Sequence, residues 1–436
     1  MVQQIQQIQP SGGFGPELRR RRLAAGLTLT GLAGRVHYSK GQLSKVERGG
    51  KAPSHELARL CDTALDAGGA LAALVPLRPA AGAEAEPGSE PQEEVWVMEL
   101  STDGRSWFRP MGRRQAVAAG AASVVGLGLG TSGAHAESSG EPLLEMSRSL
   151  FDHYRRLGQT ADPRLLLPAL IAQTHTLRET AAHGGARTRP ALLRMGSRYA
   201  EYVGWLVQET GDDRAALWWT RRAVELAAAG GDRHLAAYAQ VRRALVTLYQ
   251  DDARQTIDLA ARAQEGALPP RIRGLAAQRE AQGHALAGDY DACMRCLDRA
   301  RELLSSSGAD TDTPVIGTTH LSDPVSMITG WCLHDLGRPA EAADVLGRQL
   351  AQVPEHALRT RVRYGVRRAL ATAAAGEIDH ACALTADLLD HTTTVSSATV
   401  AADLRRVART LARHPRNASA RELSPRLSAA LPTIPT

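Results

Sequence analysis

Several residue types are scarce in this chain of 436 residues, and each scarcity excludes a class of protein. Five cysteines are too few for the disulfide framework of a small secreted domain. The opening residues, MVQQIQQIQPSGG, have neither the basic start nor the apolar core of a signal peptide, so we expect residues 1–13 to be a disordered leader. These features favour the reducing cytoplasm as the compartment.

Aromatic side chains are also rare, at 4% of residues, whereas 43% of residues are hydrophobic and 22% are charged. This composition is typical of a soluble globular protein, and the abundant alanine and glycine favour closely packed helices. The length predicts two or more domains. Lysine occurs only at Lys40, Lys45 and Lys51. We attribute the preference for arginine to codon composition, so the number of arginines does not by itself indicate a function.

The positive charge is concentrated near the N-terminus. Between Gly15 and Leu60, ten basic residues stand against three acidic ones, whereas the net charge of the whole chain is only +6. The remainder of the chain is therefore close to neutral. A basic end on a near-neutral body is typical of a protein that binds a polyanion.

Residues 14–77 divide into five short predicted helices. Pro16 suits a first helical position, and Gly26 suits a C-terminal stop. Residues 69–75 form the fifth helix. A hydroxyl side chain stands at the cap position of each of the three middle helices: Thr28, Ser39 and Ser54.

The second and third helices are joined by the short stretch VHYS and predict a helix-turn-helix. Ala33 is small enough to let the two helices cross closely. Leu43 and Val46, three residues apart, are expected to face the core. The outer face of the third helix then consists of Lys40, Gly41, Gln42, Ser44 and Lys45. Such a face would either enter a major groove of DNA or be an ordinary solvated surface.

This segment resembles the Cro/C1-type (XRE) family of helix-turn-helix regulators. The matching stretches are LxxxRxxxGLT (Leu18 to Thr28), LAxRV (Leu32 to Val36), YSKGQLSKVERG (Tyr38 to Gly49) and PS (Pro53 and Ser54). The resemblance implies sequence-specific binding of double-stranded DNA near promoters. Homodimerisation is expected, because one recognition helix offers few base contacts and natural sites of this type are two-fold symmetric.

The chain departs from the family pattern at two positions. Leu29 stands where the family usually offers a glutamine to the phosphate backbone, which puts that contact in doubt. His37 stands where the turn usually holds a glycine. Histidine accepts a left-handed conformation better than most residues, so we expect the turn to form.

We predict contacts to DNA from all three of the first helices. The four arginines at 19–22 cannot all point one way, but Arg19 and Arg22 share a face, and some of the four are expected to reach phosphates beside the groove. The predicted contact residues are Arg19, Arg22, Thr28, Arg35, Ser39, Lys40, Gly41, Gln42, Ser44, Lys45 and Arg48.

Residues 78–140 are expected to be a linker. Its first part is acidic and rich in proline, and residues 95–111 alternate around an Asp-Gly turn signal typical of a β-hairpin. The uncharged stretch 115–134 follows twin arginines and allows three interpretations: an export signal, a marginal membrane span, or a small-residue connection. The connection is favoured, because an export signal would not stand behind a DNA-binding module. The glycine pattern at 128–133 lacks the context of a dinucleotide site.

Residues 141–416 predict an α-solenoid that resembles tetratricopeptide repeats, followed by a tail at 417–436. Four glycines stand in predicted tight turns, each followed five positions later by a small residue. The pairs are Gly211 with Ala216, Gly288 with Cys293, Gly337 with Ala342, and Gly376 with Ala381. A helical bundle without superhelical order is the alternative. Such an array is expected to bind a peptide, a small molecule or a protein on its concave surface.

No catalytic motif, metal-binding pattern or cofactor fingerprint stands out, and the chain is not expected to be an enzyme. Cys293 and Cys296 lie in one predicted helix and are interpreted as packing residues, as are Cys332 and Cys382 beside their neighbouring histidines. The aromatic residues are interpreted as core of the first repeat: Tyr199, Tyr202, Trp205, Trp218 and Trp219. The long loop at 305–323 is either functional or disordered.

The sequence therefore predicts an all-α protein with a five-helix helix-turn-helix domain, a linker with a small hairpin, and a helical-repeat domain. Its expected function is that of a cytoplasmic, nucleoid-associated, one-component bacterial transcriptional regulator. Two alternatives stay open at this point: an interaction scaffold whose first domain binds protein, and a regulator tethered to a membrane through 115–134.

Overall fold

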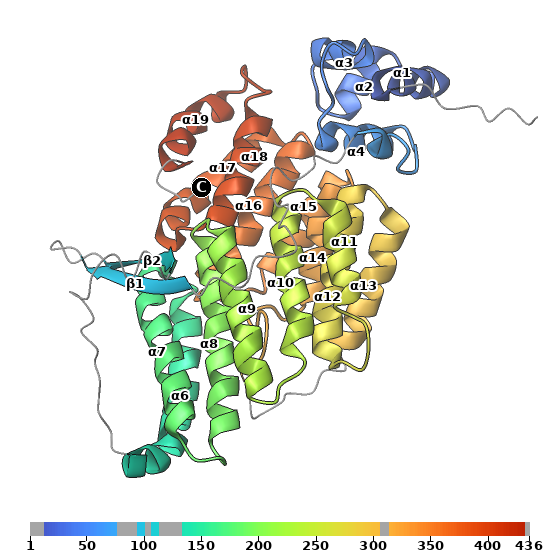
Figure 1. Cartoon of the computed structure of the whole chain (residues 1–436). Coiled ribbons are helices and arrows are strands. Elements are labelled where there is room, and N and C mark those ends of the chain that lie inside the picture. Colours follow the sequence, from blue (N-terminus) through green and yellow to red (C-terminus); the bar gives the residue numbers. More distant parts are fainter. Residues whose placement is uncertain (1–12, 76–93, 101–105, 113–132, 306–313, 432–436) are drawn as a thin grey trace, which may run out of the picture.

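The computed structural model describes residues 13–75, 94–100, 106–112, 133–305 and 314–431. We call residues 13–75 the head and residues 133–431 the body (Figure 1). The stretch 115–134, on which the membrane and export interpretations rest, lies almost entirely outside the described residues. None of the helices in the described ranges combines the length and apolar character that crossing a bilayer requires.

The head consists of four α-helices and a short 3-10 helix: α1 (Phe14–Ala24), α2 (Leu29–Arg35), α3 (Lys40–Glu47), α4 (His55–Ala64) and η1 (Ala72–Leu74). The three predicted caps are confirmed. The side-chain oxygens of Thr28, Ser39 and Ser54 accept hydrogen bonds from backbone N–H groups inside α2, α3 and α4, at 3.0–3.2 Å. Each bond satisfies a donor that the first helical turn would otherwise leave unpaired.

His37 adopts a left-handed backbone conformation, with φ of 51°, in the turn between α2 and α3. The prediction that a histidine would serve in place of the usual glycine is therefore confirmed. Leu32 and Leu43 are fully buried beneath the turn, and Val46 is nearly so. The two helices are thus fixed against the same small core.

Two antiparallel strands, β1 (Glu94–Leu100) and β2 (Ser106–Gly112), form the predicted hairpin, with Trp96 opposite Pro110.

The body is an array of seven antiparallel helix pairs in the described residues (Figure 1). The helices are α6 (Gly133–Leu157), α7 (Pro163–His183), α8 (Arg189–Glu209), α9 (Asp213–Ala229), α10 (Leu235–Tyr249), α11 (Ala253–Arg262), α12 (Pro270–Ala287), α13 (Tyr290–Ser305), α14 (Pro324–Asp335), α15 (Pro339–Leu350), α16 (Leu358–Ala374), α17 (Ile378–Val395), α18 (Ala398–Leu411) and α19 (Ala418–Ala430). The expected tail from 417 differs from the structure, because Leu423 and Leu427 of α19 are buried.

The predicted repeat turns are confirmed. Gly211, Gly288, Gly337 and Gly376 all have φ between 81° and 93°, a conformation that strains any residue with a Cβ. The small residue five positions after each glycine is buried where the paired helices approach. Asp251, with φ of 58°, occupies the same position in the turn between α10 and α11.

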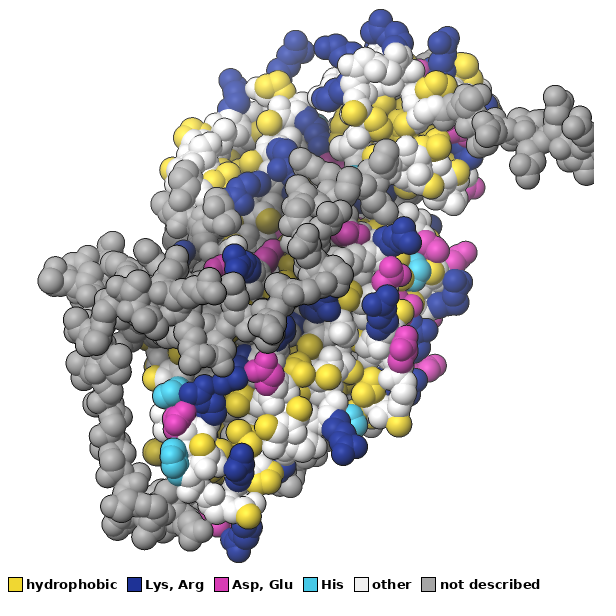
Figure 2. All heavy atoms as spheres, in the orientation of Figure 1, with side chains coloured by type: hydrophobic (Ala, Val, Ile, Leu, Met, Phe, Trp, Pro, Cys, Tyr) yellow, Lys and Arg dark blue, Asp and Glu magenta, His cyan; other side chains and the backbone are white. Residues whose placement is uncertain are grey.

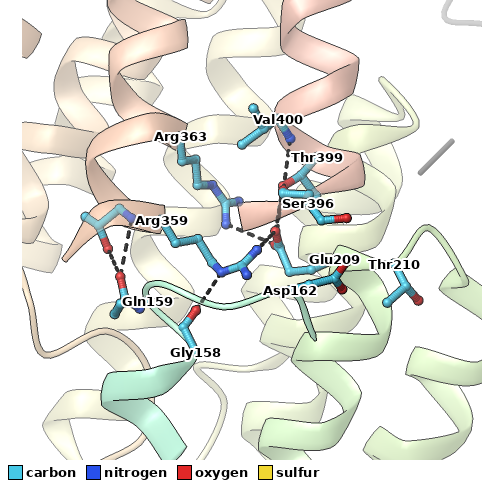
Figure 3. A network of polar contacts seen from close by, with 12 residues as sticks. Gly158, Gln159, Asp162, Glu209, Thr210, Arg359, Arg363, Ser396, Thr399 and Val400 are labelled. Atoms are coloured by element: carbon cyan, nitrogen blue, oxygen red, sulfur yellow. Dashed lines mark hydrogen bonds and ion pairs between the residues drawn. The ribbon is translucent and has the colours of Figure 1, made fainter. Parts of the chain in front are cut away.

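The array curls until its first helix pair meets its sixth and seventh. The Arg359 backbone N–H donates to the Gln159 carbonyl oxygen at 2.7 Å, and its guanidinium donates to the carbonyls of Gly158 and Ala161. The same guanidinium lies 3.5 Å from Glu209 of α8, which also receives bonds from Ser397 and Thr399 (Figure 3). These buried contacts join both ends of the array.

Candidate nucleic-acid interface

Helix α3 is held by its inner face and leaves its outer face open. Leu43 and Val46 are buried in the core of the head, as expected. Lys40, Gly41 and Lys45 are exposed, and Gln42 and Ser44 are partly exposed. A Cβ on Gly41 would meet no atom within 4 Å, so the helix is slender at this point. A slender, cationic outer face is the shape that a major groove accepts.

Most of the other predicted contact residues lie at the surface around α3. Ser39 caps the helix, and Thr28 caps α2. Arg19, Arg35 and Arg48 are exposed. The Arg48 side chain donates to the Ser44 carbonyl oxygen at 3.1 Å, which anchors it at the end of α3.

Arg22 is placed differently from the prediction. Its side chain is buried and makes two hydrogen bonds to Glu47, at 2.6 and 3.0 Å, and one to the Leu27 carbonyl oxygen. The bonds to Glu47 raise the pKa of the guanidinium. Reaching a phosphate would break this buried pair, so Arg22 joins α1 to α3 and is not available to DNA. Arg20 and Arg21 both pair with Glu17, which leaves Arg19 as the freest of the four.

Basic side chains extend beyond α3. Figure 2 shows Lys and Arg gathered near the top of the view, over the head and the adjoining part of the body. Arg416, in the turn between α18 and α19, is exposed. The positive surface expected from the sequence is therefore formed by the head and supplemented by the body.

The head is attached to the body through α4. The Thr63 hydroxyl donates to the Leu336 carbonyl oxygen at 3.0 Å, and the Arg59 guanidinium lies 4.0 Å from Asp335. A Cβ on Gly337 would stand 2.6 Å from the Arg59 carbonyl oxygen, so the backbones of head and body are nearly in contact there. In Figure 1, α4 lies between the body and the other helices of the head.

The turn glycines of the array form the surface on which the head rests. Gly288 packs against Ala72 of η1, Gly337 against α4, and Gly376 against His37 in the helix-turn-helix turn. Three successive repeat turns therefore meet three different parts of the head. The sequence pattern predicts these glycines only as turn residues, because their contact with the head depends on where the head lies.

A second contact reaches the N-terminal end of α3. Arg413, in the turn after α18, stacks over Tyr38 and donates to Glu56 at 2.8 Å. Burial would raise the pKa of Glu56, but the hydrogen bonds and charge of Arg413 outweigh it and hold the pKa below its ordinary value. Glu56 is therefore ionised at neutral pH, and the ion pair is formed.

Buried charges lead from this interface into the body. Asp335, which faces Arg59, lies 3.8 Å from Arg367 of α16. The Arg367 guanidinium lies 3.5 Å from the centre of the Trp331 ring and donates to Asp403 at 2.6 Å. No sequence motif predicted a role for these residues. The available signal was the presence of arginines at 359, 363 and 367, four apart on one face of a helix.

The described cysteines are buried and unpaired by disulfides, in agreement with a packing role. Glu280, His284 and Cys296 lie close enough together to hold a metal ion. However, Arg299 donates to Glu280 at 2.5 Å and to the Cys296 sulfur at 3.3 Å. A guanidinium therefore already supplies positive charge to this group, and burial raises the pKa of the Cys296 thiol to about 11.

Comparison with known proteins supports the assignment of the first domain. Residues 14–75 match the family model described as "Helix-turn-helix domain". No curated protein and no solved structure matched the chain. The head is therefore a helix-turn-helix domain of the kind found in DNA-binding regulators, followed by a body of many helices consistent with a repeat domain.

Proposed function

We propose that this protein is a sequence-specific transcriptional regulator that binds an operator as a homodimer and whose body binds an effector. The observation that carries the proposal is that different parts of the head face the body and the solvent. Helix α4 and the turn face the body, whereas the outer face of α3 carries Lys40 and Lys45 exposed to solvent. The body can therefore hold the head without covering the helix that would enter DNA.

The proposed contacts fall into two groups. Lys40, Gln42 and Lys45 would reach base edges, while Gly41 and Ser44 keep the helix slim enough to lie deep in the groove. Phosphates would be contacted from the flanks of α3, which fixes the register of the head without reading sequence. This second group consists of Arg19, Thr28, Arg35, Ser39 and Arg48.

The test begins with genomic footprinting, where discrete enriched sites are expected. Gel shifts with one such site then compare Lys45→Ala and Gln42→Ala with Lys51→Ala, which removes an exposed charge outside α3. The first two changes should lower the ratio of specific to random affinity, each by about 1–3 kcal/mol. Lys51→Ala should weaken both affinities alike. Unchanged discrimination in Lys45→Ala and Gln42→Ala would refute the proposed reading face.

A further inference from the structure

The curled array encloses a chamber along its axis, which we call the axial chamber. It is lined by the first helix of successive pairs, α6, α8, α10, α12, α14 and α16, and by residues 315–321. Its volume is about 170 Å³. The chamber exists because the seam between Arg359 and Gly158 closes the array, so it is a product of the superhelix and not of any single repeat.

The chamber holds more positive than negative charge. Six arginines line it, and four of them face buried or half-buried carboxylates. Arg198 pairs with Asp232, Arg242 lies near Glu201, and Arg359 and Arg363 share Glu209. Arg155 and Arg279 have no carboxylate partner among the described residues. Both guanidinium groups are partly buried, and a partly desolvated cation is stabilised by added acceptors or by negative charge.

Arg155 and Arg279 differ in the number of hydrogen bonds that their guanidinium groups donate. Arg155 donates to the carbonyl oxygens of Val315 and Gly317, at 2.7 and 2.5 Å, and so holds the loop over the chamber. Arg279 bonds only to the side-chain oxygen of Gln282 in the described residues. Arg279 therefore retains donors that a ligand could use.

A second donor beside Arg279 lacks a partner. Gln278 is only 2% exposed and lines the chamber, yet its amide nitrogen has no hydrogen-bond partner within the described part of the chain. An unpaired buried N–H group is costly, so a ligand that accepts a hydrogen bond from it would be stabilised. Gln278 and Arg279 both line the chamber, so each can donate to an acidic group bound there.

The remaining walls are apolar and largely aromatic. Tyr202 and Trp205 stack with their ring centres 5.5 Å apart, and Trp205 and Trp331 line the chamber on α8 and α14. Tyr238 and Tyr364 complete this wall. An engineered cavity of similar size, about 150 Å³, holds a molecule of benzene, so the volume suits a ligand with one ring.

We propose that the axial chamber binds a small monocyclic aromatic carboxylic acid. The carboxylate lies against Arg279 and Gln278, and the ring lies against the aromatic wall. This inference rests on the proposed function and deepens it by naming the chemical class of the effector. Trp331 contacts Arg367, whose neighbour Asp335 faces Arg59 of the head, so the bound ring borders the contacts that position the head.

Isothermal titration calorimetry with the full-length protein and no DNA tests the proposal. Benzoate and phenylacetate are the probes, and benzamide and acetate are the matched controls that lack the charge or the ring. The two aromatic acids should bind at least about tenfold more tightly than either control, since a hydrogen bond to a charged group contributes about 1.5–3 kcal/mol. Absence of binding by both acids, equal binding of benzamide, or binding only of a longer peptide with a free C-terminus would overturn it.

Two variants test where the carboxylate of the ligand binds. Arg279→Gln removes the charge, and Gln278→Glu puts a competing carboxylate in the vacant place; each should weaken benzoate binding at least tenfold. Arg254→Gln, an exposed arginine on α11, is the matched control and should bind as the parent does. Unchanged affinity in a folded Gln278→Glu protein would overturn the proposed contact, whether or not Arg279→Gln folds. Gel shifts with operator DNA on the same samples report separately on the head, so a failure of the effector proposal is distinguishable from a failure of DNA binding.

Discussion

The guanidinium of Arg413 lies 4.2 Å from the centre of the Tyr38 ring, directly over it. Tyr38 precedes Ser39, the cap of α3, while Arg413 belongs to the last turn of the array. The final repeat of the body therefore touches the residue beside the start of α3. We expect a change in the curvature of the array to reach α3 through this contact.

Replacement of Arg413 should weaken the attachment of the head to the body. Arg413→Ala removes the stacking on Tyr38 and leaves Glu56 without its cation, which should cost the docked state about 2 kcal/mol. Hydrogen exchange of the α4 amides should become faster, while exchange in α8 stays the same. The control is Arg416→Ala, an exposed arginine three residues later, which should leave α4 protected. Equal exchange in both variants would show that the contact does not hold the head.

The folded protein should lose stability below pH 6.5 because of His334. Burial lowers the pKa of this histidine from 6.5 to about 4, so the folded protein keeps it neutral. Its stabilising contribution is complete above pH 6.5 and decreases as the pH falls towards 4, because the unfolded chain then binds more protons. Between pH 6.5 and 5 the loss should be at most about 2 kcal/mol.

Unfolding by denaturant across this range measures the effect. His334→Gln should flatten the dependence of the unfolding free energy on pH, whereas His183→Gln, at an exposed position on α7, provides the comparison. Glu56 adds a second loss at lower pH, since its pKa is depressed below 4.5 and its ion pair breaks only when it takes up a proton. A parent profile that is flat from pH 6.5 to 5 would contradict the assignment to His334.

Gly337 should be less tolerant of a side chain than Gly231, another turn glycine. Gly337→Ala places a Cβ in a left-handed conformation and also 2.6 Å from the Arg59 carbonyl oxygen. Gly231→Ala is the matched control, because Gly231 has φ of 82° but would meet no atom within 4 Å. Both changes should cost about 1–2 kcal/mol of backbone strain. Gly337→Ala alone should also increase proteolysis between head and body; similar proteolysis of the two variants would argue against the contact.

The buried and the exposed ion pairs of α1 should differ sharply in their contribution to stability. Arg22→Ala leaves Glu47 buried without its cation and should destabilise the head by about 3 kcal/mol. Arg20→Ala removes an exposed partner of Glu17 and should have little effect. Thermal unfolding of each full-length variant, followed by a signal from the head, distinguishes the effects of the two replacements. If Arg22 contacted phosphate instead, its replacement would lower DNA affinity without lowering the melting temperature.

Local structure was predictable from sequence because its causes are local. The caps at Thr28, Ser39 and Ser54, the left-handed turn at His37 and the repeat glycines each follow from one residue and its neighbours. The inward position of Leu43 and Val46 follows from helical spacing alone. The domain boundaries and the individual DNA contacts stay predictions.

Contacts between distant segments were not predictable in the same way. The sequence predicted that Arg22 contacts DNA. It did not reveal the ion pair with Glu47, because Glu47 lies 25 positions away on another helix. Tyr202 and Trp205 were assigned to the core of the first repeat, and Tyr199 and Trp219 are indeed buried there. Tyr202 and Trp205, however, also line the axial chamber. That chamber depends on how far the array curls, which no single repeat encodes.

The seam at Gly158 and Arg359 has a consequence for how this body can evolve. Open repeat proteins change length by duplicating or deleting units, because each unit touches only its neighbours. Here a helix pair inserted between Gly158 and Arg359 would separate these two residues and would also part Arg359 from Glu209. The number of helix pairs between them is therefore constrained by these contacts, and new specificity within this part of the body is expected to arise by substitution.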